Sequence, residues 1–287
     1  MQQTLAIIGG SGLYQLDGLS DVEEIEVATP YGKPSDAVLR GRLGDVTLLF
    51  LPRHGRGHRF APHRINYRAN VFALKKLGAQ QVLSVSAVGS LKESIHPGDF
   101  VLVDQFIDRT RGRASTFFDD FEMVAHVGFG DPVDAALLAA VRAAAAQAGV
   151  PVHVGGAYVC MDGPQFSSRA ESQIYRGWGA SVVGMTNLPE AKLAREAELP
   201  YATIAMVTDY DCWHQSEQAV TVEQVIRVLQ ANVQKARAVI RALVGRLPDA
   251  SQSPASSALQ NAILTAPEHV PPATRKALAP LLQKYFS

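Results

Sequence analysis

The sequence predicts an α/β fold on three observations. Short apolar runs alternate with helical patterns across residues 4–245, an order that places helices against a sheet. The helical pattern at 64–77 stops at Gly78 and leads directly into the apolar run at 81–87, as in an αβ unit. With 47% hydrophobic and 19% charged residues, the chain can bury a large core and lacks the composition of a disordered protein.

A change in composition divides the chain near its end. Residues 247–257 are rich in Pro, Ser, Ala and Asp, which is typical of a linker. We therefore expect one domain over residues 1–246. A linker and a helical tail follow over residues 247–287, packing on the same domain or on a neighbouring subunit, and a short helix is expected at 271–287.

The charge and cysteine content exclude several classes of protein. The 27 basic and 27 acidic residues give a net charge of zero, which does not suggest a general nucleic-acid binder. No apolar run reaches the roughly 18–20 residues that span a bilayer, and the first residues lack the features of a secretory signal. Only Cys160 and Cys212 are present, so a disulfide framework is excluded. We expect a cytoplasmic protein with no metal and no membrane contact.

The first half of the chain reads mainly as strands. An apolar run at 4–8 ends in the glycine loop at 9–12, which predicts a buried strand and a turn. Further strands are expected at 23–27 and within 37–51, on either side of a turn at 30–34. The helix at 64–77 and the strand at 81–87 complete this half.

The second half predicts longer helices. Asp131 and Pro132 are suited to begin the helix at 133–148, and Gly149 to end it. A capping box formed by Thr221 and Gln224 begins the clearest helix. The remaining elements expected here are helices at 168–178, 189–198 and 221–244, and strands at 181–183 and 201–207.

The glycine loop and an arginine-rich segment both suit an anion. Backbone N–H groups and the serine of Gly9-Gly10-Ser11-Gly12 suit a phosphate, although Gln15 breaks the dinucleotide fingerprint and a simple tight turn is the alternative. Residues 53–68 hold five arginines and three histidines without an acid. Arginine offers a bidentate fork for phosphate. A solvated basic loop or a nucleic-acid patch remain alternatives, whereas a histidine metal site is disfavoured by the neighbouring arginines.

Two expected strands end in residues suited to a ligand. Ser86 and the N–H of Ala87 lie where a strand gives way to small residues, and ligands of α/β sheets gather at the carboxyl ends of strands. Asp209 and Asp211 follow the strand at 201–207. A protonated carboxyl can donate to a ring nitrogen, and an ionised one can accept from an amino group. A simple turn and a helix-capping acidic turn are the structural alternatives.

Nine short motifs, in order over about residues 6–245, together resemble the methylthioadenosine phosphorylases of the trimeric class of purine nucleoside phosphorylases. The resemblance implies a single α/β domain with a central mixed, twisted sheet flanked by helices. It also implies a homotrimer that needs no cofactor and that uses inorganic phosphate as a co-substrate to split a purine nucleoside. The motifs are GGSG, TPYGKPSD, RHGRGH, NYRAN, SAVGSL, DQFIDRT, GPQFSSRAES, GMTNLPE and TDYDCW.

The same resemblance implies three groups of site residues. Those implied for phosphate are Ser11, Arg53, His54, Ser86, Ala87 and Thr186. Those implied for the nucleoside are Phe166, Ser167, Met185, Asp209, Asp211, Val222 and Val225, with Asn187 near the base. Those implied to reach a neighbouring subunit's ligand are His126 and a leucine of the tail, Leu281 or Leu282.

The implied chemistry favours an adenine nucleoside. Departure of the purine leaves a positively charged sugar, which bound phosphate stabilises and then attacks. Asp209 would protonate N7, and Asp211 would accept from the exocyclic amine, which a 6-oxopurine lacks. An apolar pocket suits the 5′-methylthio group. The alternatives are a phosphorylase of 6-oxopurine nucleosides or methylthioinosine, and a non-catalytic nucleotide-binding module.

Overall fold

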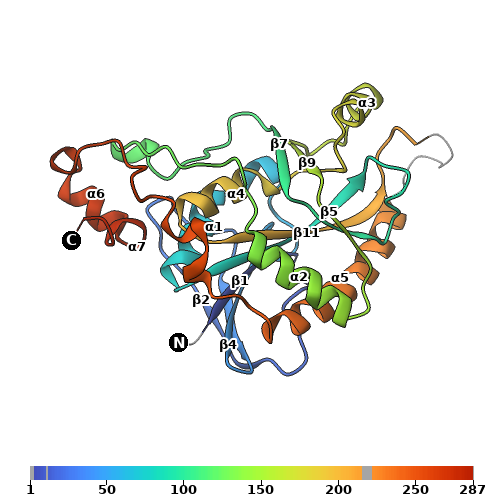
Figure 1. The fold of residues 1–287 in the computed structure, drawn as a ribbon, viewed down its shortest axis with the longest axis horizontal. Coiled ribbons are helices and arrows are strands. Elements are labelled where there is room, and N and C mark those ends of the chain that lie inside the picture. Colours follow the sequence, from blue (N-terminus) through green and yellow to red (C-terminus); the bar gives the residue numbers. More distant parts are fainter. Residues whose placement is uncertain (1–2, 11, 215–221, 287) are drawn as a thin grey trace.

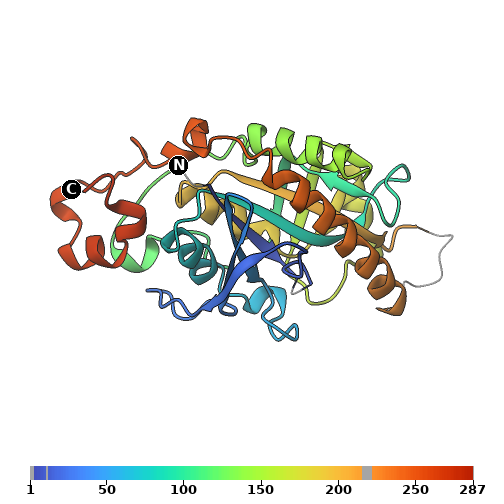
Figure 2. The same ribbon diagram turned by 90° about the horizontal axis from the view of Figure 1, so that it is seen from below.

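The computed structural model describes residues 3–10, 12–214 and 222–286. A mixed, twisted sheet crosses the molecule with helices on both of its faces (Figure 1), and a view turned by 90° shows the two helical layers edge-on (Figure 2). The predicted α/β fold is therefore confirmed. No described helix is long and apolar enough to cross a membrane.

The strands form one sheet in the order β2-β3-β4-β1-β5-β10-β9-β7, with β11 on β5, β6 on β11 and β8 on β6. Their bounds in the described chain are β1 (Thr4–Gly9), β2 (Ser20–Ile25), β3 (Val38–Leu43), β4 (Val46–Pro52), β5 (Gln81–Ser90), β6 (Phe100–Leu102), β7 (Gln105–Arg109), β8 (Val152–Val154), β9 (Ala157–Met161), β10 (Val182–Gly184) and β11 (Tyr201–Tyr210).

The centre of the sheet is parallel. Strand β1 pairs parallel with β4 and β5, and β5 pairs parallel with β11. The carboxyl ends of these four strands consequently share one edge. Strand β10 runs antiparallel to β5, with Val183 opposite Gly89, so the chain leaving β10 passes back along β5 toward Ser86.

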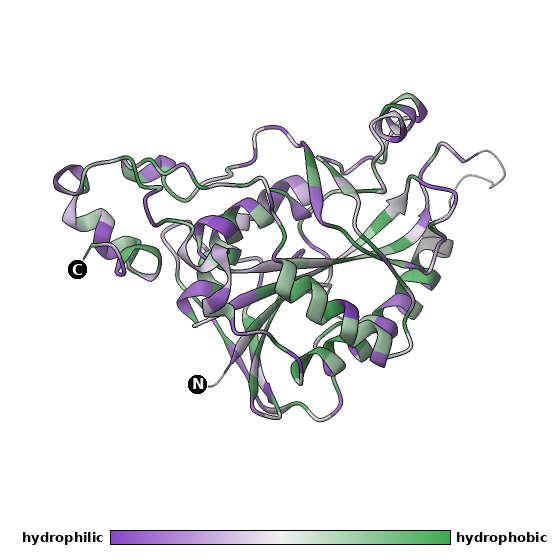
Figure 3. Ribbon diagram, viewed as in Figure 1, coloured by the Kyte–Doolittle hydropathy of each residue, from purple (hydrophilic) through white to green (hydrophobic). Residues whose placement is uncertain are grey.

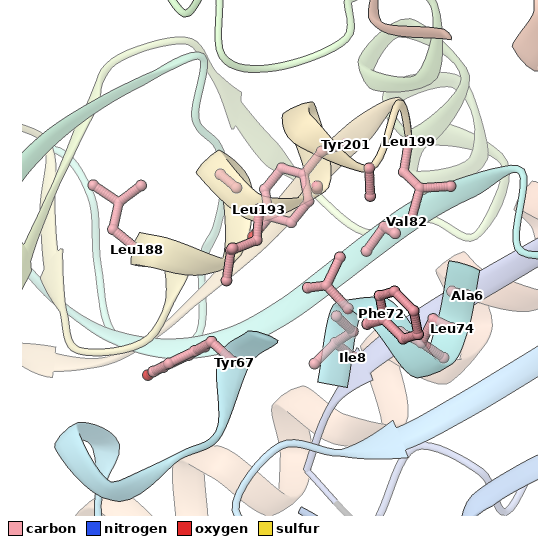
Figure 4. Close-up of a cluster of buried hydrophobic side chains, with 14 of the residues drawn as sticks. Ala6, Ile8, Tyr67, Phe72, Leu74, Val82, Leu188, Leu193, Leu199 and Tyr201 are labelled. Atoms are coloured by element: carbon pink, nitrogen blue, oxygen red, sulfur yellow. The ribbon is translucent and has the colours of Figure 1, made fainter. Parts of the chain in front are cut away.

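Helices cover both faces because each presents an apolar side to the sheet. Helices α1 and α4 cover one face, where the buried side chains in Figure 4 interlock with β1 and β5. Helices α2 and α5 cover the other, and α2 is hydrophobic along most of its length (Figure 3). The described helices are α1 (Tyr67–Lys76), α2 (Ala135–Gln147), α3 (Arg169–Gly177), α4 (Asn187–Glu196), α5 (Val222–Val244), α6 (Pro272–Ala277) and α7 (Ala279–Leu282).

Most predicted elements are present, with two differences. The N-cap of α2 is Asp134, whose Oδ1 accepts from the Leu137 N–H at 2.7 Å, and not Asp131. Strands β6 to β9 were not predicted. They are three to five residues long, which is too short to show the alternation of apolar and polar side chains that marks a strand.

The chain after residue 247 folds onto the body through short 3-10 turns and then α6 and α7. Leu259, Leu281 and Leu282 are buried in the core that α1 and α4 share. A bridge joins Ala125 to Ile263, and both views show the tail beside the segment near residue 120, far from α3 (Figures 1 and 2).

Candidate active site

The carboxyl edge of the parallel strands gathers most of the predicted site residues. Ser86 lies opposite Ala205 in the register of β5 and β11, is 5% exposed, and precedes the exposed Ala87. The chain leaving β10 brings Thr186 alongside Ser86, and the Ser86 hydroxyl donates to Asn187 Oδ1 at 3.0 Å. The structure thus joins two separate motifs at one place.

Thr186 also begins helix α4. It is the N-cap residue, yet its side chain makes no capping hydrogen bond, so its hydroxyl is not committed to the helix. Leu188 inside α4 has non-helical dihedrals (φ −121°, ψ 135°), so the regular helix begins beyond Leu188 and its N-terminal charge does not lie at Thr186. The neighbourhood suits an anion because the Ser86 and Thr186 hydroxyls lie together there, and a hydroxyl can donate a hydrogen bond to an anion.

Arg53 does not present the free fork that the sequence suggested. Its side chain is 2% exposed and forms a bidentate ion pair with Glu190, with Nε to Oε2 at 2.7 Å and Nη2 to Oε1 at 3.0 Å. Nη1 donates to Val85 O at 3.0 Å, and Nη2 also reaches Ser84 Oγ at 2.6 Å. The pair lies beneath the carboxyl edge, and its net charge is close to zero.

Three of the other four arginines of the segment are also paired within the chain. Arg56 binds Glu24 and Asp36, Arg59 also reaches Asp36, and Arg68 pairs with a carboxylate of the 119–121 turn. For these arginines, the negative charge that a basic segment calls for is supplied by carboxylates that lie far away in the sequence. Over the described residues no group of three His, Cys, Asp or Glu side chains could hold a metal.

His54 follows Arg53 and is held in one tautomer. Its Nδ1 lies 2.8 Å from Phe60 O, which can only accept, so Nδ1 carries the proton. Burial, helped by the charge of Arg53 and by His58, lowers the pKa of His54 to about 4. The ring is stacked on His58 at 4.1 Å between centroids. At neutral pH the imidazole is uncharged, and its Nε2 has a lone pair.

The acidic pair lies at the end of β11. A bulge between Val207 and Asp209 shifts the register there, and bulges re-aim side chains in this way. Gly89 faces both acids: a Cβ at Gly89 would lie 3.4 Å from Asp209 Oδ2 and 3.4 Å from the Asp211 Cβ. The Thr208 hydroxyl donates to Asp209 Oδ1 at 2.6 Å.

Asp211 is the more enclosed of the two acids. It is 6% exposed, and burial raises its pKa above the usual value for a carboxyl. Its Oδ2 is buried and accepts no well-formed hydrogen bond from the described residues, although the Ser167 and Ser172 side chains lie beside the carboxyl. A buried, unfilled carboxyl oxygen costs free energy unless a ligand satisfies it, so Asp211 suits the recognition of an amino or ring N–H group.

The loop between β9 and α3 faces the acidic pair. Cys212 Sγ donates to Ser167 O at 3.1 Å, which ties the loop to the end of β11 and fits a structural thiol. Ser167 is buried, whereas Phe166 is 72% exposed, an unusual position for so large an aromatic ring. At the start of the loop, a Cβ on Gly163 would lie 2.4 Å from Met185 Sδ, so the two motifs are in contact.

Arg113 was not predicted, yet it holds these loops together. Its guanidinium donates to Met185 O and Leu188 O, both at 2.8 Å, and to Asp162 O at 2.9 Å. The only available signal was a further arginine shortly after the DQFIDRT motif. Its partners are backbone oxygens, the Asp162 carboxylate and the Tyr67 hydroxyl, all in other segments, so no spacing in the sequence indicates this role.

Asn187 does not lie where a base would touch it. It is fully buried, and its amide donates to Tyr201 Oη at 2.6 Å and to Thr203 Oγ1 at 2.9 Å. Tyr201 in turn donates to Glu190 Oε1 at 3.0 Å. The expected place near the base is therefore wrong, and Asn187 instead connects Ser86 to the Arg53 ion pair.

The segment of His126 and the tail meet away from the acidic pair. His126 N donates to Ala262 O at 2.9 Å, and Leu264 N donates to Val124 O at 2.9 Å. Leu264 is 62% exposed, whereas Leu281 and Leu282 are buried in their own chain and cannot reach a neighbour's ligand. The tail leucine available beside His126 is Leu264, which the sequence reasoning missed because this stretch read as featureless.

Three predicted residues are not covered. Ser11 lies outside the described residues, as do the capping box of α5 and the side chains of Val222 and Val225. The backbone of those two valines belongs to the first turn and a half of α5.

Comparisons with known proteins find similar sequences over nearly the whole chain. A family model described as the phosphorylase superfamily matches residues 4–245. An S-methyl-5′-thioadenosine phosphorylase of Koribacter versatilis (strain Ellin345) is 54% identical over 286 residues, covering 100% of this chain and 98% of the relative. A protein of the same name from Geobacter sulfurreducens (strain ATCC 51573 / DSM 12127 / PCA) is 52% identical, covering 99% of this chain and 100% of the relative.

Solved structures give the same result. A crystal structure of a methylthioadenosine phosphorylase from an Antarctic soil metagenomic library has a TM-score of 0.92 and 47% identity, covering 98% of this chain and 100% of the other. A methylthioadenosine phosphorylase from Schistosoma mansoni in complex with adenine has a TM-score of 0.84 and 36% identity, covering 91% of this chain and 99% of the other.

Proposed function

The chain belongs to the phosphorylase superfamily, and from that premise we propose that it cleaves 5′-methylthioadenosine with inorganic phosphate. The products are adenine and 5-methylthioribose 1-phosphate, and the enzyme is a pentosyltransferase that serves purine and methionine salvage. The names of relatives with more than half of their residues identical, over nearly the full length, support this substrate.

One structural observation supports the reaction most strongly. A place that suits an anion, at the Ser86 and Thr186 hydroxyls, shares the carboxyl edge of the sheet with the pair Asp209 and Asp211. Phosphorolysis needs both parts: an anion beneath the sugar, and an acid at the base. Preorganised charge of this kind commonly supplies the largest part of the catalysis.

We assign roles to this chain's residues accordingly. Phosphate contacts the Ser86 and Thr186 hydroxyls, the Ala87 N–H and His54, with Ser11 contributing from the glycine loop. Arg53 supports these contacts from below through its hydrogen bonds to β5 and its ion pair. Inorganic phosphate is a co-substrate, and no cofactor takes part.

The nucleoside occupies the space between phosphate and the loop at 163–168. Asp209 protonates N7 of the leaving base, and Asp211, with its unfilled oxygen, accepts from the exocyclic amine. Phe166 and Met185 contact the base and the ribose, and Ser167 lies near the base. Val222 and Val225 line the 5′ pocket.

We further propose that the working enzyme is a cytoplasmic homotrimer. Phe166, His126 and Leu264 are exposed in the single chain, and association would cover them. His126 and Leu264 would then reach the 5′-methylthio group bound in the neighbouring subunit. Size measurement in solution tests the assembly.

A substrate panel tests the reaction. The purified protein is incubated with 5′-methylthioadenosine, adenosine, methylthioinosine and inosine, each with and without phosphate, and free base is measured. We expect phosphate-dependent release of adenine, fastest from methylthioadenosine. Faster turnover of the 6-oxopurines would favour the alternative phosphorylase, and binding without release of base would favour a non-catalytic module.

A further inference from the structure

A buried tyrosine hydroxyl lies behind the place assigned to phosphate. Tyr158, in β9, is fully buried. Its hydroxyl makes no well-formed hydrogen bond within the described residues, although it lies beside the side chains of Ser86 and Thr186 and the Thr186 backbone. The polar atom therefore points at the two hydroxyls that would hold the anion.

Packing alone does not account for this hydroxyl. The Tyr158 ring lies in the main core and makes an edge contact with Phe106, with centroids 5.9 Å apart. Phenylalanine would make the same contacts without burying a polar atom. A buried hydroxyl without a partner costs about 1–3 kcal/mol, so its presence suggests that it gains a partner when a ligand reorients the neighbouring hydroxyls.

The surroundings hold the ring in place. A Cβ on Gly184 would lie 2.0 Å from Tyr158 Oη and 2.5 Å from Cζ, so the ring occupies space that only a glycine leaves free. Gly184 ends β10 and precedes Met185 and Thr186. The position of the tyrosine hydroxyl is thus fixed relative to the turn that carries Thr186.

The hydroxyl also stays protonated. Burial raises the pKa of Tyr158 above its usual value, so the group remains a hydrogen-bond donor at any pH at which the enzyme is folded. A hydroxyl that accepts one hydrogen bond can still donate its own proton. Donation from Tyr158 to Ser86 or Thr186 would leave their protons free for phosphate oxygens and polarise them.

We propose that Tyr158 is a positioning residue for phosphate, which orients the Ser86 and Thr186 hydroxyls from behind. When phosphate binds, the Ser86 hydroxyl turns its proton from Asn187 to the anion. The Tyr158 hydroxyl then donates its own proton to the oxygen of Ser86 or Thr186. Tyr158 does not touch phosphate, because its own oxygen is covered. This inference rests on the proposed phosphorolysis and adds a determinant of phosphate affinity to it.

The test is Tyr158→Phe, which removes one oxygen. We expect the KM for phosphate to rise about tenfold, with the KM for methylthioadenosine at saturating phosphate and kcat both within about twofold. A purely structural loss would change both KM values or lower kcat. Thermal unfolding without phosphate should occur at the wild-type temperature or above, and the shift produced by added phosphate should shrink.

Two further variants complete the test. Tyr31→Phe removes a hydroxyl that donates to Phe117 O at 2.7 Å outside the site, and both KM values should stay unchanged. In a Ser86→Ala background, Tyr158→Phe should raise the KM for phosphate much less than it does in the wild type, because Tyr158 acts through the Ser86 hydroxyl. An unchanged phosphate KM in an active Tyr158→Phe enzyme would overturn the inference. Wild-type protein that releases no base would instead overturn the proposed function.

Discussion

Arg53 and Glu190 form a bidentate ion pair in the interior, 137 residues apart in sequence and each with a side chain 2% exposed. The pair holds β1, β4 and β5 together, because the guanidinium also donates to Ile8 O, Val85 O and Ser84 Oγ. Arg53 thus fixes the strand ends on which the site is built, and Glu190 balances its charge.

Glu190→Gln tests this structural role. Removing one partner leaves a buried charge uncompensated, which costs about 3–5 kcal/mol. We expect chemical denaturation to show a loss of that order. Glu24→Gln, which removes an exposed partner of Arg56, serves as the control and should cost below about 1 kcal/mol. Equal effects of the two variants would contradict the assigned role of the buried pair.

Substitutions of the two acids at the end of β11 should have different effects on turnover and on substrate preference. Asp209→Asn removes the proton donor and should lower turnover of every purine nucleoside about 100-fold or more. Asp211→Asn gives the base an amide that can also donate, so it should shift the preference toward 6-oxopurines by about tenfold. The ratio of kcat/KM for methylthioadenosine and methylthioinosine measures this. An unchanged ratio in Asp211→Asn would reject the assigned recognition of the amine.

The glycine loop, the strand ends and the acidic pair could be predicted because each motif is local. A strand run followed by Gly9-Gly10, or by Asp209 and Asp211, shows its position in the sheet directly. Strands β6 to β9 could not be predicted, because three to five residues are too few to show an alternation of apolar and polar side chains.

The ion-pair partners of the arginines could not be predicted from the sequence either. Glu190 reads in sequence as an ordinary first-turn acid after Pro189, and nothing local shows that Arg53 meets it. Tyr158 lies in β9, a strand that the sequence pattern did not predict. Side chains that act through residues far away in the sequence need the fold before their role is visible.

Glu196 should make stability depend on pH near neutrality. Burial raises its pKa to about 7, and its Oε2 accepts from Phe117 N at 2.8 Å. A carboxyl with a raised pKa in the folded state stabilises below its unfolded pKa, and that stability is lost as pH rises through about 7. We expect a loss on the order of 2 kcal/mol between about pH 5 and pH 8 that is absent in Glu196→Gln. If the free energy of unfolding changes with pH in the same way for wild type and Glu196→Gln over this range, the prediction is wrong.

His54 should make proton uptake depend on the anion that binds. Its Nδ1–H is committed to Phe60 O, the pKa is about 4, and the Arg53 charge is balanced by Glu190. The bare Nε2 can only accept, so hydrogen phosphate can donate its own P–OH to Nε2 and needs no further proton. Sulfate has no hydrogen to donate, so a proton must enter between it and Nε2.

Calorimetry in two buffers of different ionisation enthalpy, at about pH 8 where free phosphate is mainly the dianion, should show no uptake with phosphate and uptake of about one proton with sulfate. His54→Gln should abolish the uptake with sulfate. Sulfate binding without uptake would mean that His54 does not contact the anion.

Leu264 provides a test of sites shared between subunits. It is exposed beside His126, and the tail lies at the opposite end of the molecule from the end of β11 (Figure 1). In the proposed trimer Leu264 therefore completes a neighbour's pocket. Leu264→Asp should abolish activity by placing a charge in that apolar pocket, and Asp209→Asn should abolish it within its own chain.

When the two inactive proteins are unfolded together and refolded as a mixture, random assembly leaves about a quarter of the sites with both residues intact. Activity should therefore return to about a quarter of the wild-type level, while each variant refolded alone stays inactive. If a mass measurement shows that mixed trimers form but these trimers remain inactive, Leu264 serves its own chain and the pocket is not shared.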